Sequence, residues 1–238
     1  IPRTLALTVY GDMDVSKLME KPAGRLPIDT RVIPLARMDE VIEGLDRSMA
    51  HGNRAYWVCP LVEESEQVDL AAAEERFLQL ASRFKGRVGL VHGRMKGPDK
   101  DRVMQEFKDG TLSLLVSTTV IEVGVDVPEA TAIVIENAER FGLAQLHQLR
   151  GRVGRGTTAS HCVLLYKSPL SANGSQRLQA MRASTDGFYI AERDLELRGP
   201  GEVLGTRQTG LMEFRVARLP EHNQLLEQVQ ELALRLSK

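Results

Sequence analysis

The chain has 238 residues, 42% of them hydrophobic and 26% charged, with 31 basic and 32 acidic side chains and a formal net charge of -1. That length is typical of one large domain or slightly more, and the apolar content can offset the entropy lost on folding, which excludes disorder as the main state. The near-zero charge excludes a globally basic nucleic-acid coat, although a local basic strip is compatible with it. No apolar run approaches the ~20 residues that a membrane-spanning helix needs. We expect no signal peptide, and because the first residue is Ile1 rather than Met, we expect a piece of a longer protein.

Two cysteines, Cys59 and Cys162, lie far apart in the sequence, each beside apolar residues. Disulfide frameworks and zinc sites need more cysteines at short, regular spacing. We therefore expect two buried, reduced thiols of a cytoplasmic protein, and no metal site.

Apolar runs alternate with helical patterns through the first two thirds of the chain. The runs that read as strands are 4–10, 30–34, 54–60, 88–92, 112–117, 132–136 and 161–166. Between them, apolar side chains recur at helical spacing over 38–49, 70–84, 98–109 and 143–149. Strands without polar alternation, separated by helices, are typical of a parallel sheet covered on both faces. The predicted fold class is α/β, a parallel sheet flanked by helices.

Ligands of such sheets bind in the loops at the carboxyl ends of the strands. We therefore expect the chemistry of this chain in the loops that follow Val91, Val116 and Ile135.

Beyond Lys167 the pattern becomes helical. Two helices are expected over 171–185 and 188–197, followed by a glycine-rich segment over 198–210. Near the end, apolar residues from Leu225 to Leu236 fall on one face of an amphipathic helix, which needs a partner surface.

The sharpest local motif is QLRGRVGR at 148–155, which places Arg152 and Arg155 three residues apart with Gly154 between them. On a helix this spacing brings two guanidinium groups to one face. Guanidinium groups donate bidentate hydrogen bonds to phosphate oxygens, so the pair suits a triphosphate. From Arg140 to Lys167 there are five basic and no acidic residues, which concentrates positive charge here. The alternative is a solvated basic helix with flexible glycines.

Two further segments follow predicted strands. STTVIEVGVD at 117–126 begins with three hydroxyl side chains, Ser117, Thr118 and Thr119, which can contact a nucleic-acid backbone or, alternatively, cap the next helix. VHGRM at 91–95 places Arg94 after a strand, where one phosphate contact is possible and an ordinary surface arginine is equally common.

Together and in this order, these segments resemble motifs V and VI of superfamily two helicases and translocases, and Gln148, Gly151, Arg152, Gly154 and Arg155 fill the motif VI pattern QxxGRxGR. The residues at 177–181, 186–198 and 205–210 (RLQAM, DGFYIAERDLELR and GTRQTG) are similar to the translocation motif of bacterial helicases that remodel branched DNA. The transcription–repair coupling translocase shares this layout. The resemblance covers essentially the whole chain.

The resemblance implies a RecA-like second motor domain over 27–168, preceded over 1–26 by the end of the first motor domain and a linker. A translocation hairpin and a C-terminal helix would fill 169–238. ATP with Mg²⁺ would lie between the two motor domains, and the partners would be branched duplex DNA, such as stalled forks and Holliday junctions, and the first motor and wedge domains of the same protein. The implied location is the bacterial cytoplasm, at the nucleoid.

The resemblance also implies roles for single residues. Arg152 and Arg155 would reach the γ-phosphate, with Arg155 as the arginine finger, and Gln148, Gly124 and Asp126 would contact the nucleotide. The DNA backbone would be held by Arg94, Ser117, Thr118 and Thr119. Translocation would use Arg177, Arg198 and Gln208, although the two arginines could be ordinary surface charges and Gln208 could cap a helix.

The sequence contains no GxxxxGK[ST] phosphate loop and no DExH-like segment before the apparent motif V. Both would belong to the first motor domain, so we expect half of an ATPase that is inactive alone. Two alternatives remain open: a non-catalytic module that binds nucleic acid or protein, and an RNA helicase, because backbone contacts do not identify the sugar.

Overall fold

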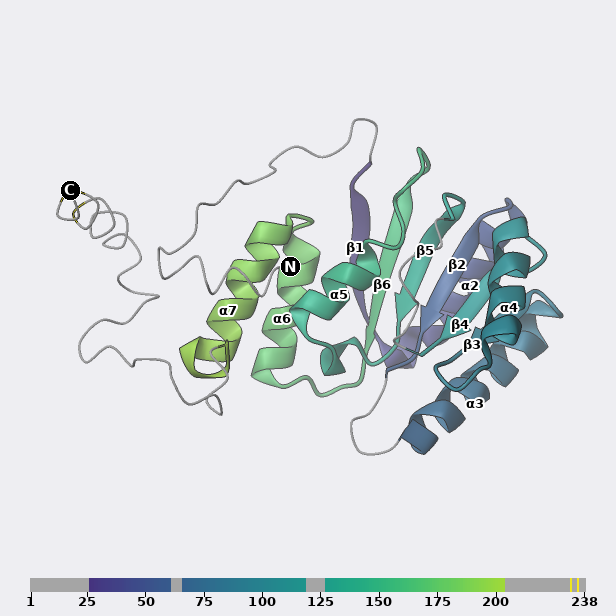
Figure 1. The fold of residues 1–238 in the computed structure, drawn as a ribbon, viewed down its shortest axis with the longest axis horizontal. Coiled ribbons are helices and arrows are strands. Elements are labelled where there is room, and N and C mark those ends of the chain that lie inside the picture. The colour runs from purple at the N-terminus through teal and green to yellow at the C-terminus, as the bar shows by residue number, and fades with distance from the viewer. Residues whose placement is uncertain (1–25, 61–65, 119–126, 204–231, 233–234, 236–238) are drawn as a thin grey trace. The chain divides into compact units, whose positions relative to one another are not determined.

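The computed structural model describes residues 26–60, 66–118, 127–203, 232 and 235 (Figure 1). The strand predicted over 4–10, most of the predicted C-terminal helix, and the predicted site residues Thr119, Gly124, Asp126 and Gln208 lie outside these residues.

A six-stranded sheet of order β1-β6-β5-β2-β4-β3 forms the centre of the fold (Figure 1). Every neighbouring pair of strands is parallel. The strands are β1 (Ile28–Pro34), β2 (Arg54–Val58), β3 (Val88–Val91), β4 (Leu114–Ser117), β5 (Ala130–Ile135) and β6 (Ser160–Tyr166). The predicted parallel sheet is therefore confirmed, and each strand predicted between residues 30 and 166 is present to within a few residues.

Helices cover both faces of the sheet, as a parallel sheet requires. On one face, α2 (Met38–Ala50) and α3 (Glu66–Phe84) form a core with Trp57, Val116 and Val134. On the other face, α4 (Gly97–Asp109) packs through Phe107 against Tyr56, with 5.0 Å between ring centroids. The remaining elements of this unit are α5 (Leu143–Arg150), α6 (Ala172–Ala183) and the 3-10 turns η1 (Leu35–Arg37) and η2 (Ala138–Arg140).

The apolar stripe and the helix-end residues predicted from the sequence are present in the structure. Val41, Ile42, Leu45 and Met49 are the buried residues of α2 and follow the predicted stripe. Helix α4 has Pro98 in its first turn and ends at Gly110, whose φ of 86° is the left-handed conformation favoured by glycine. None of the described helices is long and apolar enough to cross a bilayer.

Residues Pro22–Thr185 form one compact unit, and α7 (Gly187–Val203) belongs to a second unit that is described by itself. The domain boundaries predicted at 26 and 168 stay predictions. Helix α7 runs six residues beyond the predicted end at Leu197, through Gly199 and Pro200. Proline has no N–H to donate to the carbonyl four residues before it, but the N–H groups that follow can still form helical hydrogen bonds. The predicted end of the helix at Leu197 was therefore wrong.

Candidate nucleotide and nucleic-acid sites

Helix α5 precedes the two predicted catalytic arginines, and its ends are closed by local hydrogen bonds. Its apolar residues Leu143, Leu146 and Leu149 are buried. At the start, the Gly142 N–H donates to Gln145 Oε1 at 3.0 Å. At the end, the N–H groups of Gly151 and Arg152 donate to the carbonyls of His147 and Leu149, each at 3.0 Å. The helix therefore stops at Arg150.

Arg152 and Arg155 lie beyond that stop, in the segment Gly151–Gly156, which we name the arginine turn. Gly154 between them has a φ of 75°, a left-handed conformation that no α-helix contains. The prediction that both guanidinium groups share one helix face was wrong, because the helical spacing was assumed to continue through Gly154. A turn with a glycine at its bend positions them instead.

The arginine turn lies at the amino edge of the sheet, whereas the loops in which we expected the chemistry of the chain lie at the carboxyl edge. A Cβ on Gly154 would lie 2.8 Å from Ile28 Cγ1 and 3.9 Å from Ser160 Cβ, at the first residues of β1 and β6. A Cβ on Gly156 would lie 3.0 Å from the Pro128 carbonyl oxygen, just before β5. The reason is topological: α5 returns antiparallel to the strands, from the end of β5 toward the start of β6.

The side chains of the arginine turn suit phosphate binding. Arg155 is exposed and Arg152 is partly exposed. The Arg155 Nε donates to the Gly151 carbonyl at 3.5 Å. The Arg152 N–H bonds the Leu149 carbonyl, while its guanidinium makes no hydrogen bond or ion pair to any described residue. Gln148, on the last turn of α5, is exposed as well. With no Asp or Glu between residues 140 and 167, a phosphate group would meet no competing carboxylate from this segment.

Arg150 was missed by sequence reasoning, which treated it as one more member of the basic run. Its side chain is among the largest fully enclosed in the fold, with the residue 2% exposed. The guanidinium donates to the carbonyls of Met181 at 2.7 Å and Ser184 at 2.8 Å, at the end of α6. It also donates to His147 Nδ1 at 3.1 Å and Thr30 Oγ1 at 3.4 Å. Burial lowers the pKa of Arg150, but an arginine stays charged at any physiological pH.

The predicted DNA-binding residues lie at the opposite edge of the sheet, where β3 and β4 end. Arg94 is exposed in the turn that follows β3. Ser117 is the last residue of β4, and Thr118 donates its N–H to the Val91 carbonyl at 3.3 Å. The side chains of Ser117 and Thr118 are buried, at 0% and 3% exposure. The structure thus brings these three residues to one edge and separates them from the arginine turn by the length of the strands.

Arg177, predicted to act in translocation, is built into the fold. It lies on α6 and donates to the carbonyls of Phe141 at 2.9 Å and Glu139 at 3.0 Å, in the turn that leads into α5. This geometry excludes the alternative of a solvated surface charge. Arg198 lies on α7, whose backbone alone is described at that position.

A buried polar cluster at the carboxyl edge also escaped sequence reasoning. The Glu136 carboxylate, just after β5, accepts two hydrogen bonds from Arg76 of α3, at 2.8 and 2.6 Å, and one from the Trp57 indole at 2.9 Å. Burial opposes the charge on Arg76, but hydrogen bonding and attraction to Glu136 outweigh it and raise the pKa of Arg76. The cluster joins α3 to the ends of β2 and β5.

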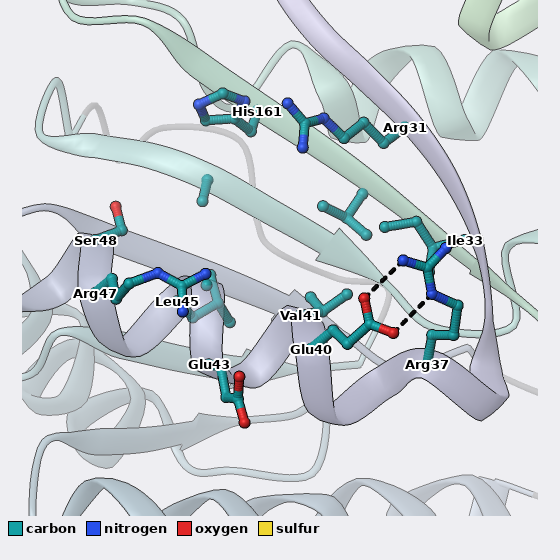
Figure 2. A pocket seen from close by; sticks show the side chains of 13 residues that line it. Arg31, Ile33, Arg37, Glu40, Val41, Glu43, Leu45, Arg47, Ser48 and His161 are labelled. Carbon is teal, nitrogen blue, oxygen red and sulfur yellow. Dashed lines mark hydrogen bonds and ion pairs between the residues drawn. The ribbon is translucent and has the colours of Figure 1, made fainter.

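A pocket of about 500 Å³ lies between α2 and the strands β1, β5 and β6 (Figure 2). Its walls carry Arg31, Arg37, Glu40, Arg47 and His161 over an apolar floor. Arg37 is paired with Glu40 at 2.8 and 2.6 Å (Figure 2). Arg31 pairs with Asp29 at 2.8 Å. None of the predicted site residues lines this pocket. The described residues include no group of three or more His, Cys, Asp or Glu side chains arranged to hold a metal.

Comparison with known families and proteins gives a consistent result. Residues 36–157 match the helicase conserved C-terminal domain, and residues 184–238 match the ATP-dependent DNA helicase RecG, domain 3, C-terminal. RecG of Escherichia coli (strain K12) is 57% identical over 235 residues, which are 98% of this chain and 34% of that protein. RecG of Streptococcus pneumoniae is 49% identical over 239 residues, covering 100% of this chain and 36% of that protein. The chain thus spans about a third of the length of these relatives.

Solved structures agree with this assignment. A RecG bound to a three-way DNA junction superposes with a TM-score of 0.73 and 46% identity, covering 95% of this chain and 29% of that one. Domain 2 of the DEAD-box helicase Mss116p, bound to an RNA duplex, has a TM-score of 0.51 at 18% identity, which shows a shared RecA-like helicase fold alone. The chain belongs to the family of helicase conserved C-terminal domains and, within it, to the RecG helicases.

Proposed function

We propose that this chain is the second motor domain of an ATP-dependent DNA helicase or translocase that remodels branched DNA, such as stalled forks and Holliday junctions. The observation that carries the proposal is the arginine turn of a RecG-family domain, with its guanidinium groups partly or fully exposed and no acidic residue nearby in the sequence. The relative bound to a three-way junction supports branched DNA as the substrate class. The site of action is the bacterial cytoplasm.

The residues of the arginine turn fit the γ-phosphate of ATP held by a first motor domain. Arg155 would donate to the phosphate oxygens as the finger, while Arg152 adds a second positive charge and Gln148 contacts the nucleotide, together with Gly124 and Asp126 from motif V. ATP with Mg²⁺ supplies the phosphoryl group when bound. The contribution of this chain is charge: guanidinium groups neutralise the negative charge that grows on the transferring group, an effect worth roughly 10³ to 10⁵ in rate in related enzymes.

The two functional edges of the sheet support a motor rather than a simple binding module. Of the proposed nucleotide contacts, Arg152 and Arg155 lie in the arginine turn at the amino edge. Of the proposed DNA contacts, Arg94, Ser117 and Thr118 lie at the carboxyl edge, and Thr119 lies outside the described residues. A rigid sheet between them carries a displacement at one edge to the other. Arg177, Arg198 and Gln208 would pass this displacement to the translocation segment.

The proposal is tested by replacing Arg155 with Ala in the full-length protein that contains this chain. We expect DNA-stimulated ATP hydrolysis to fall at least 10³-fold, by loss of the finger, with unchanged thermal unfolding because the side chain is exposed. Arg83→Ala, which removes an exposed arginine from the end of α3, is the matched control and should hydrolyse ATP normally. Near-normal turnover by the Arg155→Ala protein would refute the assignment of the finger.

A further inference from the structure

The arginine turn is held from one side by a buried cation. Arg150 is the last residue of α5 and immediately precedes the turn. Four acceptors surround its guanidinium: two carbonyls at the end of α6, a ring nitrogen on α5 and a hydroxyl on β1. A single side chain therefore ties together three elements at the point where the turn begins.

The bonding of Arg150 is unusual for a buried charge. Buried guanidinium groups are normally paired with a carboxylate, because an unpaired charge is unfavourable to remove from water. Among the residues that the structure describes, no carboxylate pairs with Arg150. Its strongest acceptors are instead the last carbonyls of α6, which carry the partial negative charge of a helix C-terminus.

This bonding leaves little freedom for α5 to rotate. The carbonyls of Met181 and Ser184 accept at 2.7 and 2.8 Å, both from the same guanidinium nitrogen. His147 Nδ1 accepts from the other terminal nitrogen, since a guanidinium only donates, so the His147 ring is oriented as well. A rotation of α5 that moved Arg152 and Arg155 would break these bonds in a buried site.

On its far side, the arginine turn is fixed by close packing. Gly154 approaches Ile28 so closely that a Cβ would overlap it, and a Cβ on Gly156 would make a tight contact of 3.0 Å with the Pro128 carbonyl oxygen. The arginine turn is therefore held by close packing on one side and by the hydrogen bonds of Arg150 on the other.

We infer that Arg150 is a positioning residue for ATP hydrolysis, which sets the place of Arg152 and Arg155 through its bonds to the end of α6 and to β1. This inference rests on the proposed function. Arg150 does not touch the nucleotide; it acts through the arginine turn. A finger displaced by about 1 Å loses on the order of 10²-fold in rate.

The test uses Arg150→Met and the milder Arg150→Lys in the full-length protein. We expect kcat for DNA-stimulated ATP hydrolysis to fall about 100-fold in Arg150→Met, with KM for ATP within threefold of the unaltered protein, because a finger acts mainly in the transition state. Arg150→Lys keeps the positive charge but loses the forked geometry of the guanidinium, and its kcat should be about 10-fold lower. Arg182→Met, an exposed arginine next to Met181, is the matched control and should be unaffected.

A double-mutant cycle separates positioning from simple destabilisation. In an Arg155→Lys background, Arg150→Lys should cause less than a threefold further loss, because both changes act through the same finger. If Arg150 had a purely structural role, Arg150→Lys would lower kcat by the same factor whether position 155 is Arg or Lys. A normal kcat in Arg150→Lys, or full additivity, would overturn the inference.

Failure of the inference can be distinguished from failure of the proposed function. If Arg155→Ala hydrolyses ATP normally, the finger assignment that carries the proposed function is wrong. If Arg155→Ala is inactive while Arg150→Lys is normal, only the positioning role is wrong. Should Arg150→Met fail to fold by circular dichroism, the results for Arg150→Lys decide.

Discussion

Burial changes the chemistry of individual side chains in this domain. Cys59 lies at the end of β2 and Cys162 within β6, and both are buried. Burial raises the pKa of each thiol to about 12; for Cys59 the negative charge of Glu136 adds to the effect. Because the thiolate is the reactive form, both cysteines should be inert in the native protein.

We predict that a thiol-specific disulfide reagent labels no cysteine of the native chain at pH 8 and labels both after denaturation. The free energy of unfolding should also fall as the pH rises from about 9 toward 12, since in this range the unfolded chain releases thiol protons that the folded chain retains. Cys59→Ser should halve the labelling of the denatured chain, which identifies the sites. Rapid labelling of the native chain would contradict the burial of both thiols.

A second residue-level prediction concerns the buried pair of Arg76 and Glu136. Arg76→Met leaves a buried carboxylate without its cation, which should lower the free energy of unfolding by about 3 kcal/mol. Arg37→Met removes an equally well-formed pair with Glu40 that is exposed, and should cause no measurable change. Urea unfolding followed by the emission of Trp57, the one tryptophan of the chain, measures both. Equal effects of the two substitutions would show that burial does not set the strength of these pairs.

Glycines shape the connections between elements, and the arginine turn depends on two of them. Gly154 combines a left-handed backbone with a close approach to Ile28, whereas Gly52, at the end of α2, has a φ of 83° and nothing within 4 Å of a Cβ. Substitution of Gly52 therefore tests the energetic cost of backbone strain alone, and substitution of Gly154 tests strain together with steric overlap.

We predict that Gly52→Ala lowers the free energy of unfolding by about 1 kcal/mol, the cost of a left-handed alanine. Gly154→Ala should lower it by about 2 to 4 kcal/mol, because overlap with Ile28 adds a further 1 to 3 kcal/mol. In the full-length protein, Gly154→Ala should also reduce ATP hydrolysis, because relief of the overlap moves the arginine turn. Thermal denaturation of the two variants is the measurement, and equal melting temperatures would contradict the overlap.

The height of the sheet separates the arginine turn from the described residues that we propose to contact DNA. Arg94, Ser117 and Thr118 lie at the carboxyl edge, and the arginine turn lies at the amino edge. The sequence contains no phosphate loop, so in the proposed mechanism this domain would supply positive charge to a nucleotide without enclosing it.

We therefore predict no DNA-stimulated ATP hydrolysis by the isolated chain. Joining it to the upstream region that its RecG relatives contain should restore turnover, because the phosphate loop and the residues that bind Mg²⁺ would come from that region. Release of inorganic phosphate with branched and linear DNA measures both preparations. Steady hydrolysis by the isolated chain would show that it contains a complete catalytic site and would remove the basis for the two-domain proposal.

The sequence determined those features that depend on local pattern. The apolar runs from Thr30 to Tyr166 predicted the parallel sheet, because side chains buried on both faces leave no polar alternation. Pro98 and Gly110 marked the ends of α4 through their own backbone preferences. The motif at 148–155 identified the family through residue types and spacing alone, which need no coordinates.

Tertiary contacts decided the rest. Arg152 and Arg155 were predicted on one helix face, but the left-handed Gly154 and the return path of α5 place them in a turn at the amino edge, away from the loops in which the chemistry was expected. Arg150 looked like any basic residue, because the carbonyls of Met181 and Ser184 that bury it are more than 30 residues away in the chain. Glu136 likewise meets Arg76 and Trp57 only across the folded sheet. Such partners are chosen by packing between distant segments, for which the spacing of residues along the chain contains no direct signal.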